Sequence, residues 1–357
     1  MMPFEGTVNA AVATLCLSYC LLADAQLVMT DTEVIALGSR PFELVRQLRP
    51  GPLKEALSRC ASQRDIYQRT DFSIGHRGAA LHYPEHTMES YVAAATQGAG
   101  IVECDVTFTK DRELVCRHDQ CGLHSTTNIV ETPLAQKCTV PPKFDVSGNV
   151  SNAESIQCCT SDLTLKEFKL LQGTMRGADA SRKGRGTLVS HAESIELFQR
   201  LGVGMAPELK IPEVAMPFEG SYTQESFAQQ MIDEYVAAGI APGRVWPQSF
   251  SYADVLYWIH NTPAFGDQAV MLDSREVAGS NDAQAVAMLD PSMAQLARDG
   301  LHFLAPAIPM LLAVDKSGAI IPSAYARSAR TAGLNLIGWT TERSGELNNG
   351  GGGYYYS

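Results

Sequence analysis

Acidic and basic side chains recur at short spacings in two parts of this sequence. Glu103 and Asp105 are two residues apart, and so are Glu208 and Lys210. In a β-strand, residues i and i+2 point to the same face, so the members of each pair would project together. Carboxylates gathered in one buried place repel each other unless a cation lies between them. Glu103, Asp105 and Glu208 therefore predict a site for one hard divalent cation, Ca²⁺ or Mg²⁺.

Two histidines and two further positive charges accompany these carboxylates. His76 is followed by Arg77, and His118 is followed by Asp119, in each case at the end of a predicted strand. A histidine can act as a general acid or base near neutral pH. Arg77 and Lys210 supply fixed positive charge for an anionic oxygen. One hard cation, two imidazoles and two such charges together favour the cleavage of a phosphate ester.

Zinc is a poorer explanation for the other histidines near His76. His82 and His86 have the i, i+4 spacing of a helical ligand pair, but Pro84 lies between them. A proline inside a helix costs about 3 kcal/mol, so a helical ligand pair is not expected here. We expect His82 to be an ordinary loop residue and His86 to lie at the start of the following helix.

The candidate residues need a scaffold that brings distant segments together. Apolar strand-like runs alternate with helical stretches, which predicts a parallel β-sheet. The predicted strands lie at 72–78, 101–108, 114–119, 203–210, 244–250, 269–274, 301–306 and 334–342. Polar candidates collect at the carboxyl ends of these strands, where parallel α/β barrels build their active sites. We therefore expect a TIM-type (β/α)8 barrel over residues 71–357.

The N-terminal residues indicate export. Residues 1–25 combine an apolar run with Ala23-Asp24-Ala25, a small-x-small pattern typical of signal-peptide cleavage sites. The alternative for this run is a buried or membrane-associated helix. Residues 26–70 carry helix-like stretches, which we expect to form an N-terminal helical cap outside the core. We therefore predict a secreted, extracellular protein.

The cysteines agree with export. Five of the nine lie between Cys116 and Cys159, in a region rich in Pro, Ser, Thr and Asn. We expect residues 120–164 or so to be an inserted loop region stapled by disulfides. A zinc cluster is the alternative, but the spacings match no common zinc pattern. The odd number left after signal removal predicts one free thiol, which we assign to Cys104.

Composition restricts the class of partner. The net charge is −11 and no basic cluster is present, which disfavours nucleic acid and anionic membrane surfaces. No other segment is long and apolar enough for a stable membrane span. We expect a small-molecule substrate, and the sequence does not indicate an oligomeric state.

The ordered motifs resemble those of the glycerophosphodiester phosphodiesterase family. That family carries H-R-G, P-E-N-T, E-x-D-V-x-x-T-K-D-G, H-D and E-x-K, and this sequence has "HRG" at 76–78, "PEHT" at 84–87, "ECDVTFTKDRE" at 103–113, "HD" at 118–119 and "ELK" at 208–210. The resemblance implies a TIM-type barrel and metal-dependent hydrolysis of glycerophosphodiesters to glycerol 3-phosphate and an alcohol. His86 and Arg112 depart from the family's usual Asn and Gly.

The resemblance also implies roles for individual residues. Carried over by motif, the metal ligands are Glu103, Asp105 and Glu208, the catalytic histidines are His76 and His118, and the phosphate contacts are Arg77 and Lys210. Glu85 either reaches the substrate, orients Arg77 or only shapes the start of a helix. Trp339 in "GWTTE" either lines the substrate pocket or is a core residue, and Gln248, Ser249 and Phe250 are weaker candidates of the same kind.

Three functional alternatives follow. The family usually has a further strand and helix after the W-T strand, but only "RSGELNNGGGGYYYS" follows here. We therefore expect the barrel to be C-terminally incomplete, and one alternative is an inactive truncated binding protein. The other two are a lysophospholipase D and a sphingomyelinase D-type phosphodiesterase, since related enzymes share the paired carboxylates and two histidines.

Overall fold

The computed structural model describes residues 35, 37–38, 40–63, 68–175, 185–275, 277 and 279–341. All of the described residues belong to one compact unit. The predicted signal peptide at 1–25 lies outside the described residues. Within the described part of the chain, no helix has the length and apolar character needed to cross a membrane.

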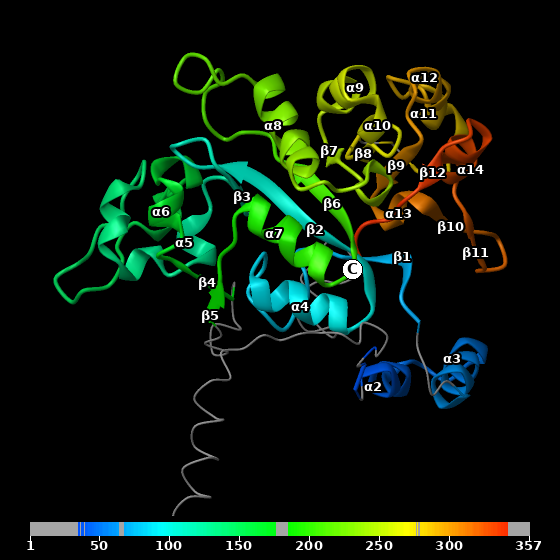
Figure 1. The fold of residues 1–357 in the computed structure, drawn as a ribbon. Helices are drawn as coiled ribbons and strands as arrows, with labels where there is room; N and C mark the ends of the chain where they lie inside the picture. Colours follow the sequence, from blue (N-terminus) through cyan, green and yellow to red (C-terminus); the bar gives the residue numbers. More distant parts are fainter. Residues whose placement is uncertain are drawn as a thin grey trace, which may run out of the picture. The chain divides into compact units, whose positions relative to one another are not determined.

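An eight-stranded sheet forms the centre of the fold (Figure 1). Its order is β1-β2-β6-β7-β8-β9-β12, and these strands are all parallel to their neighbours. The strands are β1 (Thr70–Gly75), β2 (Ala99–Phe108), β3 (Leu114–Cys116), β6 (Gly204–Leu209), β7 (Gln248–Ser249), β8 (Val270–Asp273), β9 (Phe303–Pro306) and β12 (Asn335–Leu336). The predicted parallel sheet of a TIM-type barrel is thus confirmed.

Strand β3 differs from the other strands because it runs antiparallel to β2. A hairpin turn joins them, in which Arg112 has a left-handed backbone with φ of 63°. Glycine adopts this conformation without steric cost, which accounts for the glycine preference at this position in the resembled family. Strand β3 and the residues that follow it run back along β2. The amide of Arg117 donates to the carbonyl of Asp105 at 2.7 Å.

Helices connect most of the parallel strands, as the alternation predicted. They are α2 (Arg40–Gln47), α3 (Pro52–Gln63), α4 (Met88–Thr96), α5 (Leu123–Thr126), α6 (Leu165–Phe168), α7 (His191–Arg200), α8 (Gln224–Ala237), α9 (Tyr252–Asn261), α10 (Pro263–Gly266), α11 (Ala283–Ala287), α12 (Met293–Arg298), α13 (Ile308–Leu311) and α14 (Ala324–Thr331). Helices α4 and α7 pack against β2 (Figure 1). Helices α2 and α3 fall in the predicted cap at 26–70, whose boundary stays a prediction.

The helical pattern of residues 285–300 predicts one continuous helix, and this prediction is wrong. The structure divides it into α11 and α12, with Pro291 between them. Proline lacks the amide hydrogen that a helix interior needs, and its ring clashes with the preceding turn. Ser292 then caps the new helix by accepting a hydrogen bond from the amide of Gln295.

The region predicted as a stapled insertion has a small core of its own. Leu123, Ile129, Cys158, Leu163 and Phe168 are among its buried residues. Short helices and two small antiparallel strands, β4 (Gln172–Thr174) and β5 (Arg185–Thr187), accompany it. A second two-stranded element, β10 (Leu312–Val314) with β11 (Ile320–Pro322), lies between α13 and α14.

The described residues include three disulfides, and one of them corrects the assignment of the free thiol. Cys104 is bonded to Cys116, which joins β2 to β3. The other two, Cys121–Cys159 and Cys138–Cys158, staple the insertion as predicted. Cys60 is the free cysteine among the described residues, and it is exposed. Strand position alone was a poor guide, because the hairpin places Cys104 beside a residue twelve positions away.

Candidate active site

Three buried carboxylates meet at the carboxyl ends of β2 and β6. The register pairs Asp105 with Glu208, and Glu103 lies two residues before Asp105 on the same face of β2. One carboxylate oxygen from each residue lies within 4.8 Å of the others. The structure therefore brings together the three residues that the sequence singled out as cation ligands.

The carboxylates influence each other strongly. Burial, followed by the charges of Asp105 and Glu208, raises the pKa of Glu103 well above its usual range. Burial and Asp105 raise the pKa of Glu208 to about 8. Burial acts in the same direction on Asp105, but Lys210 and His86 hold the pKa of that carboxyl well below its usual range. A divalent cation between the three groups would relieve this repulsion.

One oxygen of the cluster is left over for such a cation. Asp105 Oδ1 is buried and has no hydrogen-bond partner among the described residues. A buried carboxylate oxygen without a partner is costly, so it calls for a partner that is not a protein group. The all-oxygen donor set of Glu103, Asp105 and Glu208 suits Mg²⁺ or Ca²⁺ better than softer metals.

Arg77 and Lys210 place positive charge around the carboxylates. The backbone amide of Arg77 donates to Glu103 Oε2 at 2.9 Å, and its Nε lies 3.9 Å from Asp105 Oδ2. Lys210 Nζ donates to Glu208 Oε1 at 2.6 Å. Arg77 has φ of 57°, and the next residue, Gly78, has no room for a side chain because a Cβ would lie 2.5 Å from Ser90 Oγ. The H-R-G motif thus folds as one tight turn.

His76 lies at the rim of this cluster. Its Nε2 is 3.7 Å from Glu103 Oε2, and its Nδ1 is 3.1 Å from the hydroxyl of Thr340. The side chain is 37% exposed, so it can reach a bound molecule. Desolvation and the charge of Arg77 lower the pKa of His76 to about 3, which leaves the imidazole neutral at neutral pH.

His118 reaches the same region from the antiparallel strand. It follows β3 by two residues, and its charge affects the pKa values of both His76 and Asp105. Its Nδ1 is 2.5 Å from Asp119 Oδ1. A carboxylate at Nδ1 orients an imidazole. The two predicted catalytic histidines therefore lie near the carboxylates, with different partners.

Glu85 contacts Arg77, which favours one of the three interpretations of this residue. Glu85 Oε2 accepts from Arg77 Nη1 at 2.9 Å, and Glu85 Oε1 lies 3.5 Å from Nη2 of Arg117. Arg117 is buried and also donates to the backbone carbonyl of Glu85 at 3.0 Å. Glu85 is thus held between two guanidinium groups and can orient Arg77 toward the cluster.

Trp339 and Gln248 have different surroundings. Gln248 Nε2 donates to Glu103 Oε1 at 2.9 Å, which makes it part of the site. Trp339 donates through Nε1 to the carbonyl of Ala305 at 2.6 Å and packs edge-on against Phe250. Ser249 is buried and donates its hydroxyl to Asp254, so it supports the end of β7.

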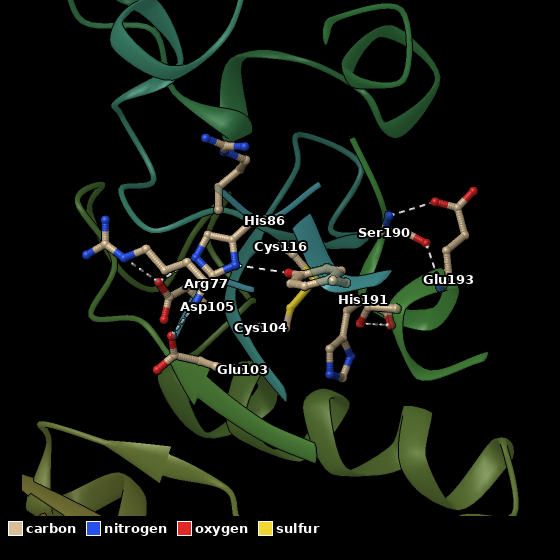
Figure 2. Close-up of a disulfide and its surroundings, with 12 residues drawn as sticks. Arg77, His86, Glu103, Cys104, Asp105, Cys116, Ser190, His191 and Glu193 are labelled. Carbon is tan, nitrogen blue, oxygen red and sulfur yellow. Dashed lines mark hydrogen bonds and ion pairs between the residues drawn. A yellow bond between two sulfur atoms is a disulfide. The ribbon is translucent and has the colours of Figure 1, made fainter. Parts of the chain in front are cut away.

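The sequence missed one buried contact of Asp105. His86 Nε2 lies 2.7 Å from Asp105 Oδ2, and His86 Nδ1 lies 2.9 Å from the hydroxyl of Tyr91. Figure 2 shows Arg77, His86, Glu103 and Asp105 grouped on one side of the disulfide Cys104–Cys116. His86 does precede α4, as predicted, but a left-handed backbone with φ of 54° accompanies its inward position. A departure from the family's usual Asn was the signal that could have drawn attention to it.

Comparison with known proteins decides the family. The model of the glycerophosphoryl diester phosphodiesterase family matches residues 76–344, which is most of the chain and includes the whole candidate site. This chain belongs to that family. The family consists of phosphoric diester hydrolases, as the motifs indicated.

This chain is similar to proteins of other organisms. An "Extracellular protein" of Arthroderma benhamiae is 45% identical over 174 residues, which are 48% of this chain and 69% of that protein. A glycerophosphodiester phosphodiesterase of Arabidopsis thaliana is 29% identical over 157 residues, which are 43% of this chain and 40% of that protein. The second alignment spans less than half of either protein.

Solved structures support the fold of the family. A glycerophosphoryl diester phosphodiesterase from Silicibacter pomeroyi aligns with a TM-score of 0.55 and 18% identity, over 79% of this chain and 86% of that chain. A phosphodiesterase from Oleispira antarctica, solved in complex with the product sn-glycerol-3-phosphate, aligns with a TM-score of 0.50 and 18% identity, over 76% of this chain and 84% of that chain. At these identities the likeness establishes the shared TIM-barrel fold.

Proposed function

We propose that this protein is a secreted, divalent-cation-dependent enzyme that hydrolyses glycerophosphodiesters to glycerol 3-phosphate and an alcohol. The observation that carries the proposal is the cluster of Glu103, Asp105 and Glu208, whose oxygens lie within 4.8 Å of one another beside His76. The product bound to the Oleispira antarctica relative is consistent with this substrate class. The oligomeric state is not part of the proposal.

In the proposed reaction the two histidines move protons. One of His76 and His118 removes the proton from the glycerol 2-hydroxyl, whose oxygen attacks phosphorus to form a cyclic phosphate. The other protonates the oxygen of the departing alcohol as its bond to phosphorus breaks. Water then opens the cyclic phosphate with the roles reversed, which restores both histidines and yields glycerol 3-phosphate.

The remaining residues would bind the cation, contact the phosphate or orient these groups. Glu103, Asp105 and Glu208 would hold the cation, Ca²⁺ or Mg²⁺, which when bound would neutralise charge on a phosphoryl oxygen. Arg77 and Lys210 lie against these carboxylates and can contact the phosphate. Glu85 orients Arg77. Trp339, beside Phe250, is the candidate for the wall of the substrate site.

Secretion is proposed on two observations. Three disulfides join cysteines in the part of the chain that the structure describes, and disulfides persist mainly in oxidising compartments. A relative that is 45% identical over its aligned part carries the name "Extracellular protein". The signal peptide proposed at residues 1–25 would direct the chain there.

The test is turnover of glycerophosphocholine by chelator-treated protein, with Ca²⁺ or Mg²⁺ added back and glycerol 3-phosphate measured. We expect activity only with added cation, and a loss of about 10²–10⁴-fold in kcat for His76→Ala and for His118→Ala. His82→Ala is the matched control, because His82 is an exposed histidine of the same segment. Full activity after thorough chelation would exclude the cation-dependent reaction.

The same assay separates the alternatives. A lysophospholipase D would prefer lysophosphatidylcholine, and a sphingomyelinase D-type enzyme would prefer sphingomyelin, over glycerophosphocholine. A binding protein without catalysis would turn over none of them. Preference for glycerophosphocholine, with loss in both histidine variants, is the result that the proposal requires.

A further inference from the structure

His86 is a fully buried histidine with two hydrogen-bonding partners behind the acidic cluster. Its ring has no exposed surface, and its backbone amide is tied to the carbonyl of Arg77 at 3.1 Å. Nε2 faces Asp105 Oδ2 at 2.7 Å, and Nδ1 faces the Tyr91 hydroxyl at 2.9 Å. The imidazole therefore bridges a side chain of α4 and a carboxylate of β2.

The partners of His86 determine the direction of the two hydrogen bonds. Tyr91 is fully buried, and its ring is fixed by edge-on packing against Phe198, with ring centres 4.8 Å apart. When the Tyr91 hydroxyl donates to Nδ1 of a neutral imidazole, the ring proton must be on Nε2, which then donates to Asp105. This assignment gives the hydroxyl an acceptor and the carboxylate a donor.

Asp105 is thereby divided into two unequal oxygens. Oδ2 accepts from His86, whereas Oδ1 is buried and has no hydrogen-bond partner among the described residues. An oxygen from each of Glu103, Asp105 and Glu208 lies within the same 4.8 Å cluster. Groups that bond to the outer side of a metal ligand commonly set its orientation, and their loss weakens metal binding.

We propose that Tyr91 and His86 form a positioning relay, which fixes Asp105 Oδ2 by a hydrogen bond and keeps Oδ1 available to a divalent cation. The inference rests on the cation site of the proposed function. It concerns positioning residues, since neither His86 nor Tyr91 contacts the substrate in the proposed reaction. The relay assigns a reason to the histidine that replaces the family's usual Asn.

The test is calorimetric titration of Ca²⁺ or Mg²⁺ into chelator-treated protein, which measures cation affinity without turnover. We expect His86→Ala to weaken binding by about 10–100-fold. Tyr91→Phe keeps the ring packing and removes only the hydroxyl, so it should weaken binding by a smaller factor. His86→Asn can still donate to Asp105 and should bind more tightly than His86→Ala.

His191 offers a matched control elsewhere in the fold. It is also fully buried and bridges a carboxylate and a tyrosine, with Nδ1 2.7 Å from Glu234 Oε2 and Nε2 3.1 Å from the Tyr235 hydroxyl. His191→Ala should therefore disturb packing to a similar degree and leave cation affinity unchanged. If His86→Ala does not fold, Tyr91→Phe carries the test.

The outcomes separate the relay from the site it serves. Weaker binding in Tyr91→Phe and His86→Ala, but not in His191→Ala, supports the relay. Wild-type affinity in Tyr91→Phe, or in a folded His86→Ala, overturns the relay and leaves the cation site intact. Equal weakening in His191→Ala also overturns it. A wild-type protein that binds neither cation overturns both proposals.

Discussion

Asp273 shows how a single buried carboxylate joins two parts of the barrel wall. It ends β8, and Arg275 donates to it through Nε at 2.8 Å and through Nη2 at 2.7 Å. The hydroxyl of Tyr325 on α14 donates to the same carboxylate. Burial raises the pKa of Asp273, but the bonds from Arg275 and Tyr325 outweigh it and hold the pKa below its usual value.

We expect Asp273→Asn to lower the free energy of unfolding by about 3 kcal/mol near neutral pH, since it leaves Arg275 without its buried ionic partner. The folded-state pKa lies below the unfolded value of about 3.9. The contribution is therefore complete above that value and is lost as the pH falls through the folded-state pKa. Urea unfolding should show a difference between wild type and variant that shrinks in acid.

Asp267→Asn is the control for this prediction, because Asp267 is an exposed carboxylate. Its unfolding free energy should stay within about 0.5 kcal/mol of wild type. The wild type and Asp273→Asn should differ less in unfolding free energy in acid than at neutral pH. An equal difference at both pH values would contradict the ionic role of Asp273.

The sequence could predict that the three candidate carboxylates lie together, but not all of their neighbours. Asp105 was recognisable because it lies two residues after Glu103, and Glu208 because it lies two residues before Lys210. Residues with this spacing on a strand share a face. The contact of Gln248 with Glu103 spans 145 positions, and that of Thr340 with His76 spans 264. Such contacts depend on how the sheet curls, which local spacing does not encode.

At the scale of elements, the hairpin of β2 and β3 carries Glu103 and Asp105 and leads to His118. Cys104 lies between Glu103 and Asp105, and Cys116 precedes the segment that ends in His118. Their disulfide, which is buried, ties the strand that carries the carboxylates to the strand that leads to His118. The covalent link limits how far one strand can slip along the other.

We expect the double variant Cys104→Ala/Cys116→Ala to lose about 3 kcal/mol of unfolding free energy, which is the usual effect of a disulfide that closes a loop of this size. It should also bind divalent cations more weakly, because Asp105 loses its fixed position. Urea unfolding and calorimetric titration would measure the two effects. The control is the double variant Cys138→Ala/Cys158→Ala, which opens a bridge of the insertion. It should lower the free energy of unfolding and leave cation affinity unchanged. Weaker cation binding in this control would argue against a special role of the Cys104–Cys116 bridge.

Most strands and helices could be located from periodicity and turn residues. Thr87 caps α4 by accepting from the amide of Ser90, and Gly98, just after that helix, has a left-handed φ of 99°. The direction of β3 could not be read in the same way, because an isolated strand has the same pattern in either direction. The break at Pro291 was predictable from the proline itself, and the sequence interpretation overlooked it.

At the scale of the whole molecule, the disulfides and the exposed thiol make the redox state measurable. Cys60 is the free cysteine of the described residues, and the remaining six are paired. We expect unreduced, denatured protein without residues 1–25 to take up one alkylating group, and the reduced protein to take up seven, by intact mass spectrometry. Uptake of more than one group before reduction would mean that one of the three bridges does not form in the protein.

Cys158 and Cys159 are neighbours in the chain, yet they belong to different bridges. In an unfolded chain, Cys121 and Cys138 can each react with either of these two sulfurs almost equally well. Oxidation before folding would therefore also produce the wrong bridges, Cys121–Cys158 and Cys138–Cys159. Thiol–disulfide exchange must then correct them, on a time scale of seconds to hours. Biogenesis of this protein is therefore expected to depend on a disulfide isomerase, and its yield from a host to follow that host's capacity for disulfide exchange.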